Sequence, residues 1–455
     1  MTPRPALLAV LLIAACSDAT SPDGTITVTS PNASQVATRG VPFTYDASQA
    51  GTTCTHASGA ALTYRVAITP AVPGLSVQGA TITGTPTAPA VSEVVLTATD
   101  AQGRQAADTF ELVVFREGLR TPTLGAGLSY IGLPAHYANA GNPVIAADNT
   151  PANNAITNAG ATLGRVLFYD RRLSRLDNVS CGSCHTQATG FADTARLSRG
   201  FAGGLTGRHS MGLANARFYN GGRFFWDERA ATLEAQVLQP IQDTTEMGLT
   251  LTQALVKLRA TPYYAPLFTA AFGSADITSD RVARALAQFV RSLVSTDSKF
   301  DRAFAGGVAP NFAAVFTPQE LDGLNLFNGP VAGCARCHGT NAHISDAVHN
   351  TGLDPTITDV GAGQGRFKSP SLRNVAVRAP YMHDGRFATL EQVVAFYDSG
   401  VQPNPALDPR LRTPGGAPIR LNLTAEARAA LVAFLRTLTD STMLTAEKFA
   451  DPFGG

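Results

Sequence analysis

Two short motifs, Cys181-Gly-Ser-Cys184-His185 and Cys334-Ala-Arg-Cys337-His338, decide how most of this chain is interpreted. Both have the pattern C-x-x-C-H, in which two thiols three positions apart can form thioethers to the vinyl groups of a haem. The histidine that follows can then bind the iron as its proximal ligand. The sequence therefore predicts two covalently bound haem c groups, with His185 and His338 as iron ligands.

Two other uses of paired cysteines fit these motifs less well. A structural zinc site needs four protein ligands close together, and the two motifs lie far apart in the chain. A thioredoxin-like pair is expected beside a βαβ pattern, which is missing here. Haem attachment remains the best interpretation, and the export signal described next supports it because c-type haem is attached outside the cytoplasm.

The first residues are typical of an exported lipoprotein. Arg4 precedes an apolar run over 6–15, too short for a membrane-spanning helix of about 20 residues but typical of a signal peptide. Small residues stand directly before Cys16, as in bacterial lipoprotein signals. We predict a signal peptide over 1–15, a lipidated Cys16, a tether over 16–23, and a location in the periplasm or at the cell surface, at the outer membrane. An ordinary cleaved signal with a chance cysteine is the alternative.

Residues 24–116 predict an all-β module. Short runs such as TITVT, VPFTYDA, ALTYRVAI and FELVVF are rich in Val, Thr, Ile and Tyr and are bounded by Gly, Pro, Asp and Ser, a composition typical of strands. Six or seven such runs fit a β-sandwich. The stretch over 74–103 resembles immunoglobulin/cadherin-like domains of bacterial surface proteins. Cys54 has no cysteine partner in this module and is interpreted as a buried structural thiol.

Residues 117–158 are rich in Gly, Pro, Asn and Ala and predict a linker. Apolar residues then recur at helical spacing in GATLGRVLFYD, SDRVARALAQFVRSLVS and TAEARAALVAFLRTL. Thr317-Pro318-Gln319-Glu320 is a capping box with proline at the first helical position. The remainder of the chain is therefore predicted to be mostly helical.

The overall composition excludes some classes of protein. The chain has 455 residues, a formal net charge of +1 and 44% hydrophobic residues. These values allow large buried cores and exclude a disordered chain. Because there is no basic excess, we expect no nucleic-acid partner.

Three stretches around the motifs resemble the bacterial di-haem cytochrome c peroxidase/MauG family. They are LGRVLFYDRRLS (163–174), FFWDERAATLEAQVLQPIQDTTEMG (224–248) and GRFKSPSLRNVAVRAPYMHDGRFATLEQVVAFY (365–397). The resemblance implies two helical, cytochrome c-like domains after the sandwich, each with one haem. We place the peroxidatic domain at 159–310 and the electron-transfer domain at 311–455.

The resemblance also implies roles for residues around the first haem. Gln236 and Glu246 match the family's distal glutamine and glutamate, which assist peroxide cleavage. Classical members carry a removable distal histidine, but the aligned position here falls near Phe201. His209 is the only later candidate for that cap. We therefore expect an open, five-coordinate iron at the first haem.

Trp226 matches a family residue that lies between the haems and is expected to relay electrons. At the second haem, the helix that opens with Thr389 places Tyr397 on its buried face, and this position is tyrosine in MauG-type members and methionine in classical peroxidases. Met382 is the competing ligand. His383, next to it, matches a family position that supports the site.

The family also holds a calcium ion between the haems through an asparagine side chain and nearby backbone carbonyls. His209 stands at the asparagine position, and imidazole is a poor ligand for a hard cation. Backbone oxygens of Arg378 and Pro380 could still contribute, so the sequence leaves calcium open.

Together these features predict a MauG-type di-haem peroxidase. It would reduce hydrogen peroxide at an open ferric haem and draw electrons through the second haem. The partner would be a small periplasmic donor (a cytochrome c or cupredoxin) or a protein substrate. A non-enzymatic electron-transfer cytochrome and a haem-dependent oxygenase are the alternatives.

Overall fold

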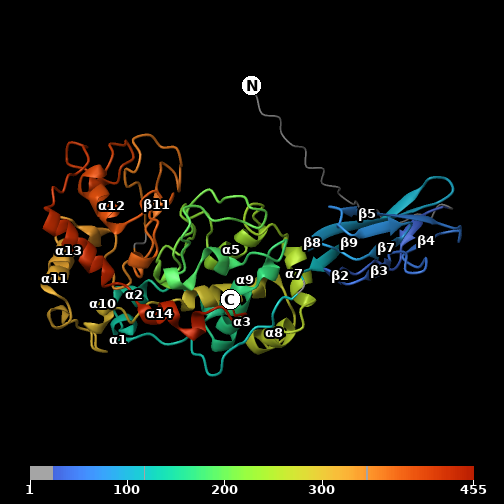
Figure 1. Cartoon of the computed structure of the whole chain (residues 1–455), viewed down its shortest axis with the longest axis horizontal. Coiled ribbons are helices and arrows are strands. Elements are labelled where there is room, and N and C mark those ends of the chain that lie inside the picture. Colours follow the sequence, from blue (N-terminus) through green and yellow to red (C-terminus); the bar gives the residue numbers. More distant parts are fainter. Residues whose placement is uncertain (1–23, 117, 345–346, 455) are drawn as a thin grey trace. The chain divides into compact units, whose positions relative to one another are not determined.

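The computed structural model describes residues 24–116, 118–344 and 347–454. Their contacts divide them into two compact units, one of residues 24–88 and 92–112 and one of residues 89–91 and 113–454. The first unit is built of strands and the second is mostly helical (Figure 1). The signal peptide, tether and lipidated Cys16 predicted from the sequence lie outside the described residues.

The β-rich region is a sandwich. A four-stranded sheet has the order β2-β9-β8-β5, a three-stranded sheet the order β3-β7-β6, and β1 pairs with β4. The strand bounds are β1 Ile26–Val28, β2 Gln35–Thr38, β3 Phe43–Asp46, β4 Cys54–His56, β5 Thr63–Thr69, β6 Leu75–Gln78, β7 Thr81–Gly84, β8 Ala90–Thr99 and β9 Gln105–Phe115. Cys54 is 2% exposed, as expected of a structural thiol. The short strands β2 and β4 were not predicted from the sequence, because each has too few residues to show an alternating pattern.

The second unit carries helices that the apolar spacing predicted and several short ones that it did not. The helices are α1 Ala135–Ala138, α2 Pro143–Ala146, α3 Asn158–Tyr169, α4 Cys181–Cys184, α5 Leu233–Val237, α6 Gln239–Gln242, α7 Leu251–Arg259, α8 Tyr264–Phe272, α9 Ser279–Ser292, α10 Lys299–Arg302, α11 Pro318–Asn328, α12 Leu390–Ala395, α13 Ala425–Arg436 and α14 Ser441–Thr445. A two-stranded ribbon pairs β10 (Val348–His349) with β11 (Phe367–Lys368). Among the described residues, no helix is both long and apolar enough to cross a membrane.

Two helix pairs, α3 with α9 and α11 with α13, form the scaffold around the two cysteine motifs. In each pair a glycine allows a close crossing. A Cβ atom on Gly164 of α3 would lie 2.0 Å from the carbonyl oxygen of Ala285, and one on Gly323 of α11 would lie 2.0 Å from that of Ala430. Any larger residue would push the helices apart and open their packed apolar faces. A glycine at the helix crossing therefore supports the packing in both halves of the helical unit.

Local sequence signals set the helix starts. Thr317 accepts a hydrogen bond from the backbone N–H of Glu320, and the Glu320 side chain accepts in return, so the predicted capping box is present. The stretch predicted as a linker also carries short helices, and its Tyr137 is buried and donates to the carbonyls of Ser295 and Asn341. This segment therefore packs into the helical unit, because Tyr137 and Val144 supply apolar surface within a polar composition.

Candidate haem sites

The first cysteine motif forms its own short helix, and the histidine follows it directly. Ser180 and Ser183 make a capping box that starts α4, and His185 stands at the C-cap. The Nδ1 atom of His185 lies 2.8 Å from the carbonyl oxygen of Phe191. That bond orients the ring, as a hydrogen bond to the second nitrogen of a metal-binding histidine does. Burial lowers the pKa of His185, which keeps the imidazole neutral and suited to iron.

Glu246 is held close to the first motif. Its carbonyl oxygen accepts the backbone N–H of Phe201 at 2.9 Å. Burial is the main cause that raises the pKa of both motif thiols, Cys181 and Cys184, and the negative charge of Glu246 adds to it. Burial raises the pKa of Glu246 itself, and neighbouring Asp243 adds to the effect. A raised pKa makes a carboxyl group easier to protonate, which favours its use in acid–base chemistry.

Phe201, the residue nearest the position where the family's removable histidine is expected, packs on the Glu246 segment. A Cβ atom added to Gly248 would lie 2.4 Å from the Phe201 ring, so only glycine leaves room for that ring. Gln236 is half-buried on α5. Within the described chain, no hydrogen bond joins the side chains of Gln236 and Glu246.

The second motif lines a mostly apolar cavity. Cys334, Cys337 and His338 line it together with both candidate ligands, Tyr397 and Met382. Burial is the main reason that the pKa of His338 falls to about 4, so this imidazole is also neutral. Two thiols, a neutral imidazole and apolar walls in one cavity fit a covalently bound haem.

Tyr397 stands where the helix changes its winding. α12 ends at Ala395 and continues as one π-helical turn, Phe396–Gly400. π-turns of this kind occur frequently at functional sites. Burial raises the pKa of Tyr397, and among the described residues its hydroxyl has no hydrogen-bond partner, although it borders the cavity. Met382 reaches the same cavity from a backbone with φ +71°.

Trp226, His209 and His383 form a connected group. The indole N–H of Trp226 donates to the carbonyl oxygen of His209 at 2.8 Å. The backbone N–H of His209 donates to the carbonyl oxygen of His383 at 2.8 Å. The Trp226 and His383 rings meet edge to face at 6.4 Å, and His383 stacks on Phe367 at 3.6 Å. The structure thus brings together Trp226 and His383, two predicted site residues that come from different stretches of the sequence.

The surroundings of His209 contain both backbone carbonyl oxygens and a buried positive charge. The Nδ1 atom of His209 faces the carbonyl oxygens of Ala195 and Arg196. Burial is the main cause that lowers the pKa of His209 and His338, and the positive charge of the buried Arg378 guanidinium adds to it. A positively charged guanidinium therefore lies in the region where the sequence left calcium open.

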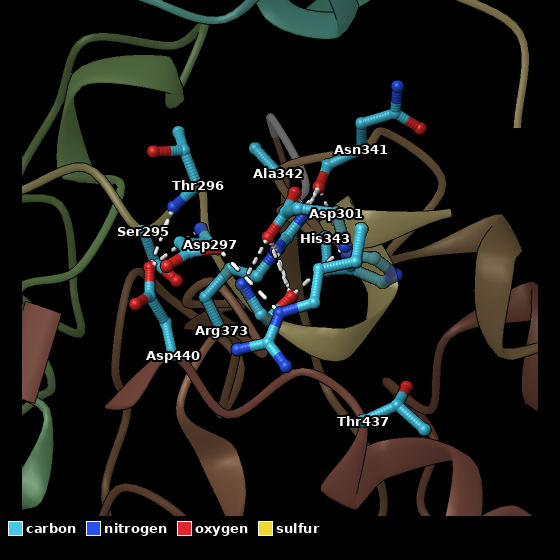
Figure 2. Close-up of polar contacts among 12 residues, drawn as sticks. Ser295, Thr296, Asp297, Asp301, Asn341, Ala342, His343, Arg373, Thr437 and Asp440 are labelled. Atoms are coloured by element: carbon cyan, nitrogen blue, oxygen red, sulfur yellow. Dashed lines mark hydrogen bonds and ion pairs between the residues drawn. The ribbon is translucent and has the colours of Figure 1, made fainter. Parts of the chain in front are cut away.

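A buried polar network beside the second motif was missed by the sequence analysis. Arg373 is fully buried and donates to the Asp301 carboxylate at 2.9 Å and to the Asn341 carbonyl at 3.1 Å (Figure 2). In the same view, Asp440 accepts the backbone N–H groups of Thr296 and Asp297. This network ties α10 to the loop that follows His338. No local pattern marks Asp301 as the partner of a residue so distant in sequence.

Comparison with known proteins confirms the fold class and the family. The family model described as di-haem cytochrome c peroxidase matches residues 158–309, and one described as a putative Ig domain matches residues 25–115. The methylamine utilization protein MauG of Methylorubrum extorquens is 36% identical over 299 residues, which cover 63% of this chain and 80% of that protein. Cytochrome c551 peroxidase of Nitrosomonas europaea is 33% identical over 341 residues, 70% of this chain and 91% of that protein. The crystal structure of a MauG-like protein associated with microbial copper homeostasis superposes with a TM-score of 0.59 and 31% identity, over 72% of this chain and 99% of that one.

Proposed function

This chain belongs to the di-haem cytochrome c peroxidase and MauG family of oxidoreductases, and we propose from that membership that it reduces hydrogen peroxide. The first haem would be held by Cys181, Cys184 and His185, and the second by Cys334, Cys337 and His338. When bound, the first haem supplies an iron that accepts peroxide, and the second supplies a route for electrons.

The observation that carries this proposal is the placement of Glu246. Its carboxyl group lies near the first pair of thiols and has a raised pKa. It would take the proton from one peroxide oxygen and deliver it to the other, so that the leaving oxygen departs as water. Gln236 would orient the peroxide by hydrogen bonding. Phe201 offers no atom that could bind iron, which favours an iron open to peroxide.

We propose that Tyr397 would bind the iron of the second haem together with His338, with Met382 as the alternative. A phenolate oxygen favours ferric iron, whereas a thioether raises the reduction potential. Trp226 would carry electrons between the two haem sites, and His383 would hold the position of the indole by packing on its edge.

The remaining expectations become part of the same proposal. Cys16 would carry lipid after removal of residues 1–15, and the sandwich over 24–116 would act as a spacer outside the cytoplasm. The haem domains would span 159–310 and 311–455, joined to the sandwich through 117–158. The electron donor would be a small periplasmic cytochrome c or cupredoxin, or the protein would oxidise a partner protein. A calcium ion between the haems stays part of the proposal, held by the backbone oxygens of Arg378 and Pro380.

The test is to mix the ferric, haem-loaded protein with hydrogen peroxide and record the Soret band and the peroxide consumed. We expect a high-spin signal in the resting EPR spectrum, a rapid Soret change and turnover with a reduced donor. An entirely low-spin resting spectrum without a Soret change would identify an electron-transfer cytochrome instead. Oxygen uptake without added peroxide would identify an oxygenase.

A further inference from the structure

Tyr219 has an unusual hydrogen-bond partner for a fully buried tyrosine. Its side chain is 0% exposed, and its hydroxyl donates to the carboxylate of Glu228. Of the ten tyrosines in the chain, two others donate to a carboxylate, Tyr263 and Tyr264, and both use Asp170. A carboxylate can receive the phenolic proton, which a backbone carbonyl cannot, because a carbonyl is far too weak a base.

The backbone around Glu228 is held in a conformation that glutamate does not favour. Glu228 has φ +55° and Phe225 has φ +70°, in the left-handed region that costs an ordinary residue about 1–2 kcal/mol relative to a right-handed conformation. Glycine would occupy this position without that cost. A glutamate at a positive φ, with its carboxylate on a buried phenol, indicates that the carboxylate has a use. Glu228 is itself half-exposed, so a proton that it receives can exchange with solvent.

Lys368 joins Tyr219 to Trp226. Its Nζ atom lies 3.3 Å from the centroid of the Tyr219 ring and 4.5 Å from that of Phe224, and it donates to the carbonyl of Arg223 at 2.7 Å. Its backbone N–H donates to the carbonyl oxygen of Trp226 at 2.8 Å. One residue therefore contacts both the tyrosine ring and the backbone of the tryptophan proposed as the electron relay.

We propose that Tyr219 is a redox-active tyrosine that gives one electron to oxidised Trp226 while its phenolic proton moves to Glu228. The inference rests on the proposed function, because hydrogen peroxide is the oxidant that removes the electron from Trp226. In this step the tyrosine O–H bond breaks and a carboxylic O–H bond forms on Glu228. The products are neutral Trp226, a neutral tyrosyl radical and protonated Glu228. An external donor later returns one electron to Tyr219, and the proton moves back from Glu228.

The other carboxylate-bonded tyrosines provide a matched control. Tyr264 is 0% exposed and donates to Asp170 at 2.6 Å, so its hydrogen bond is of the same kind. Its ring contacts are with Tyr263 and Phe268, and among the described residues none of its interactions involves Trp226 or Lys368. Tyr264→Phe therefore removes a buried tyrosine–carboxylate pair without touching the proposed path.

The experiment is rapid freeze-quench EPR of the haem-loaded protein mixed with hydrogen peroxide, prepared with natural and with ring-deuterated tyrosine. We expect a radical signal that narrows on tyrosine deuteration, is lost in Tyr219→Phe, and persists in Tyr264→Phe. The signal should also be lost in Glu228→Gln, whose amide can accept a hydrogen bond but not a proton. Glu228→Gly relieves the positive φ but removes the acceptor of the buried Tyr219 hydroxyl. Urea unfolding of each haem-loaded variant therefore shows whether a lost signal reflects unfolding.

The outcomes separate this inference from the proposed function. If peroxide changes the Soret band but the radical is unaffected by tyrosine deuteration, or is equally strong in Tyr219→Phe, the redox role of Tyr219 is wrong and the peroxidase proposal stands. A signal that Tyr264→Phe removes and Tyr219→Phe does not would overturn the role in the same way. If peroxide causes no Soret change in the natural protein, the peroxidase proposal itself fails, and the role of Tyr219 fails with it.

Discussion

The two halves of the helical unit share a scaffold and an attachment motif but differ in what faces the motif. In both, a glycine lets two helices cross closely, Gly164 for α3 and α9 and Gly323 for α11 and α13. Near the first motif lies a carboxyl group with a raised pKa, that of Glu246. The second motif shares its cavity with two side chains that can bind iron, Tyr397 and Met382. The comparison teaches that C-x-x-C-H decides where a haem attaches, whereas the residues opposite decide what its iron can do.

The largest expected effect comes from removing the acid–base group of the first half. Glu246→Gln keeps the size of the side chain but cannot shuttle a proton, so peroxide turnover should fall by about 10²–10⁴-fold. Turnover with a reduced donor measures this effect. Glu426→Gln, at an exposed carboxylate of α13, is the matched control and should keep full activity. Unchanged turnover in Glu246→Gln would remove the proposed functional difference between the halves.

The second half should depend on its buried ion pair for stability. Asp301→Asn leaves the fully buried guanidinium of Arg373 without its carboxylate, and breaking a buried pair in this way costs about 3–5 kcal/mol. Urea unfolding of the haem-loaded protein should show this loss. Asp297→Asn is the control, since Asp297 is exposed and its ion pair with Arg302 spans 3.7 Å; it should change the free energy of unfolding by under about 1 kcal/mol. Equal losses in the two variants would contradict the assignment.

A spectroscopic change should separate the two candidate ligands of the second haem. Tyr397→Phe removes the phenol oxygen, so the low-spin species of that haem should disappear from the resting EPR spectrum. Met382→Leu should leave it in place. The reverse pattern would make Met382 the ligand and would bring the second half closer to the classical peroxidases.

The smallest expected effect is a pH dependence of the Tyr219 radical. Burial lowers the pKa of Lys368 to about 7, against the opposing effect of the Glu228 charge. Below that pH the ammonium group over the ring stabilises unoxidised Tyr219, and above it the amine is neutral. The EPR signal should therefore grow as pH rises through about 7. Lys368→Met should keep the EPR signal high both below and above about pH 7. Any increase of the signal with pH that remains in this variant would belong to titration of Glu228. A signal independent of pH in the natural protein would exclude this role for Lys368.

The sequence by itself determined the features that depend on short spacing. The two C-x-x-C-H motifs, the capping boxes at Thr317 and Thr389, and the longer amphipathic helices are read from neighbouring residues. Together with three longer stretches they were sufficient for the fold class and the family. Short helices such as α1 and α2, and strands of three or four residues such as β2 and β4, were not predicted. Each is too short to show a periodic pattern of apolar residues.

Only the tertiary structure decided which distant residues meet. Asp301 with Arg373, Glu246 with the thiols of the first motif, and Tyr219 with Glu228 and Lys368 are brought together by packing. A hydrogen bond or an ion pair depends on the positions of two atoms in space, and the chain between them leaves no periodic trace in the sequence. Helix caps and attachment motifs are local and can be read from the sequence, whereas buried charge pairs are long-range and require the fold.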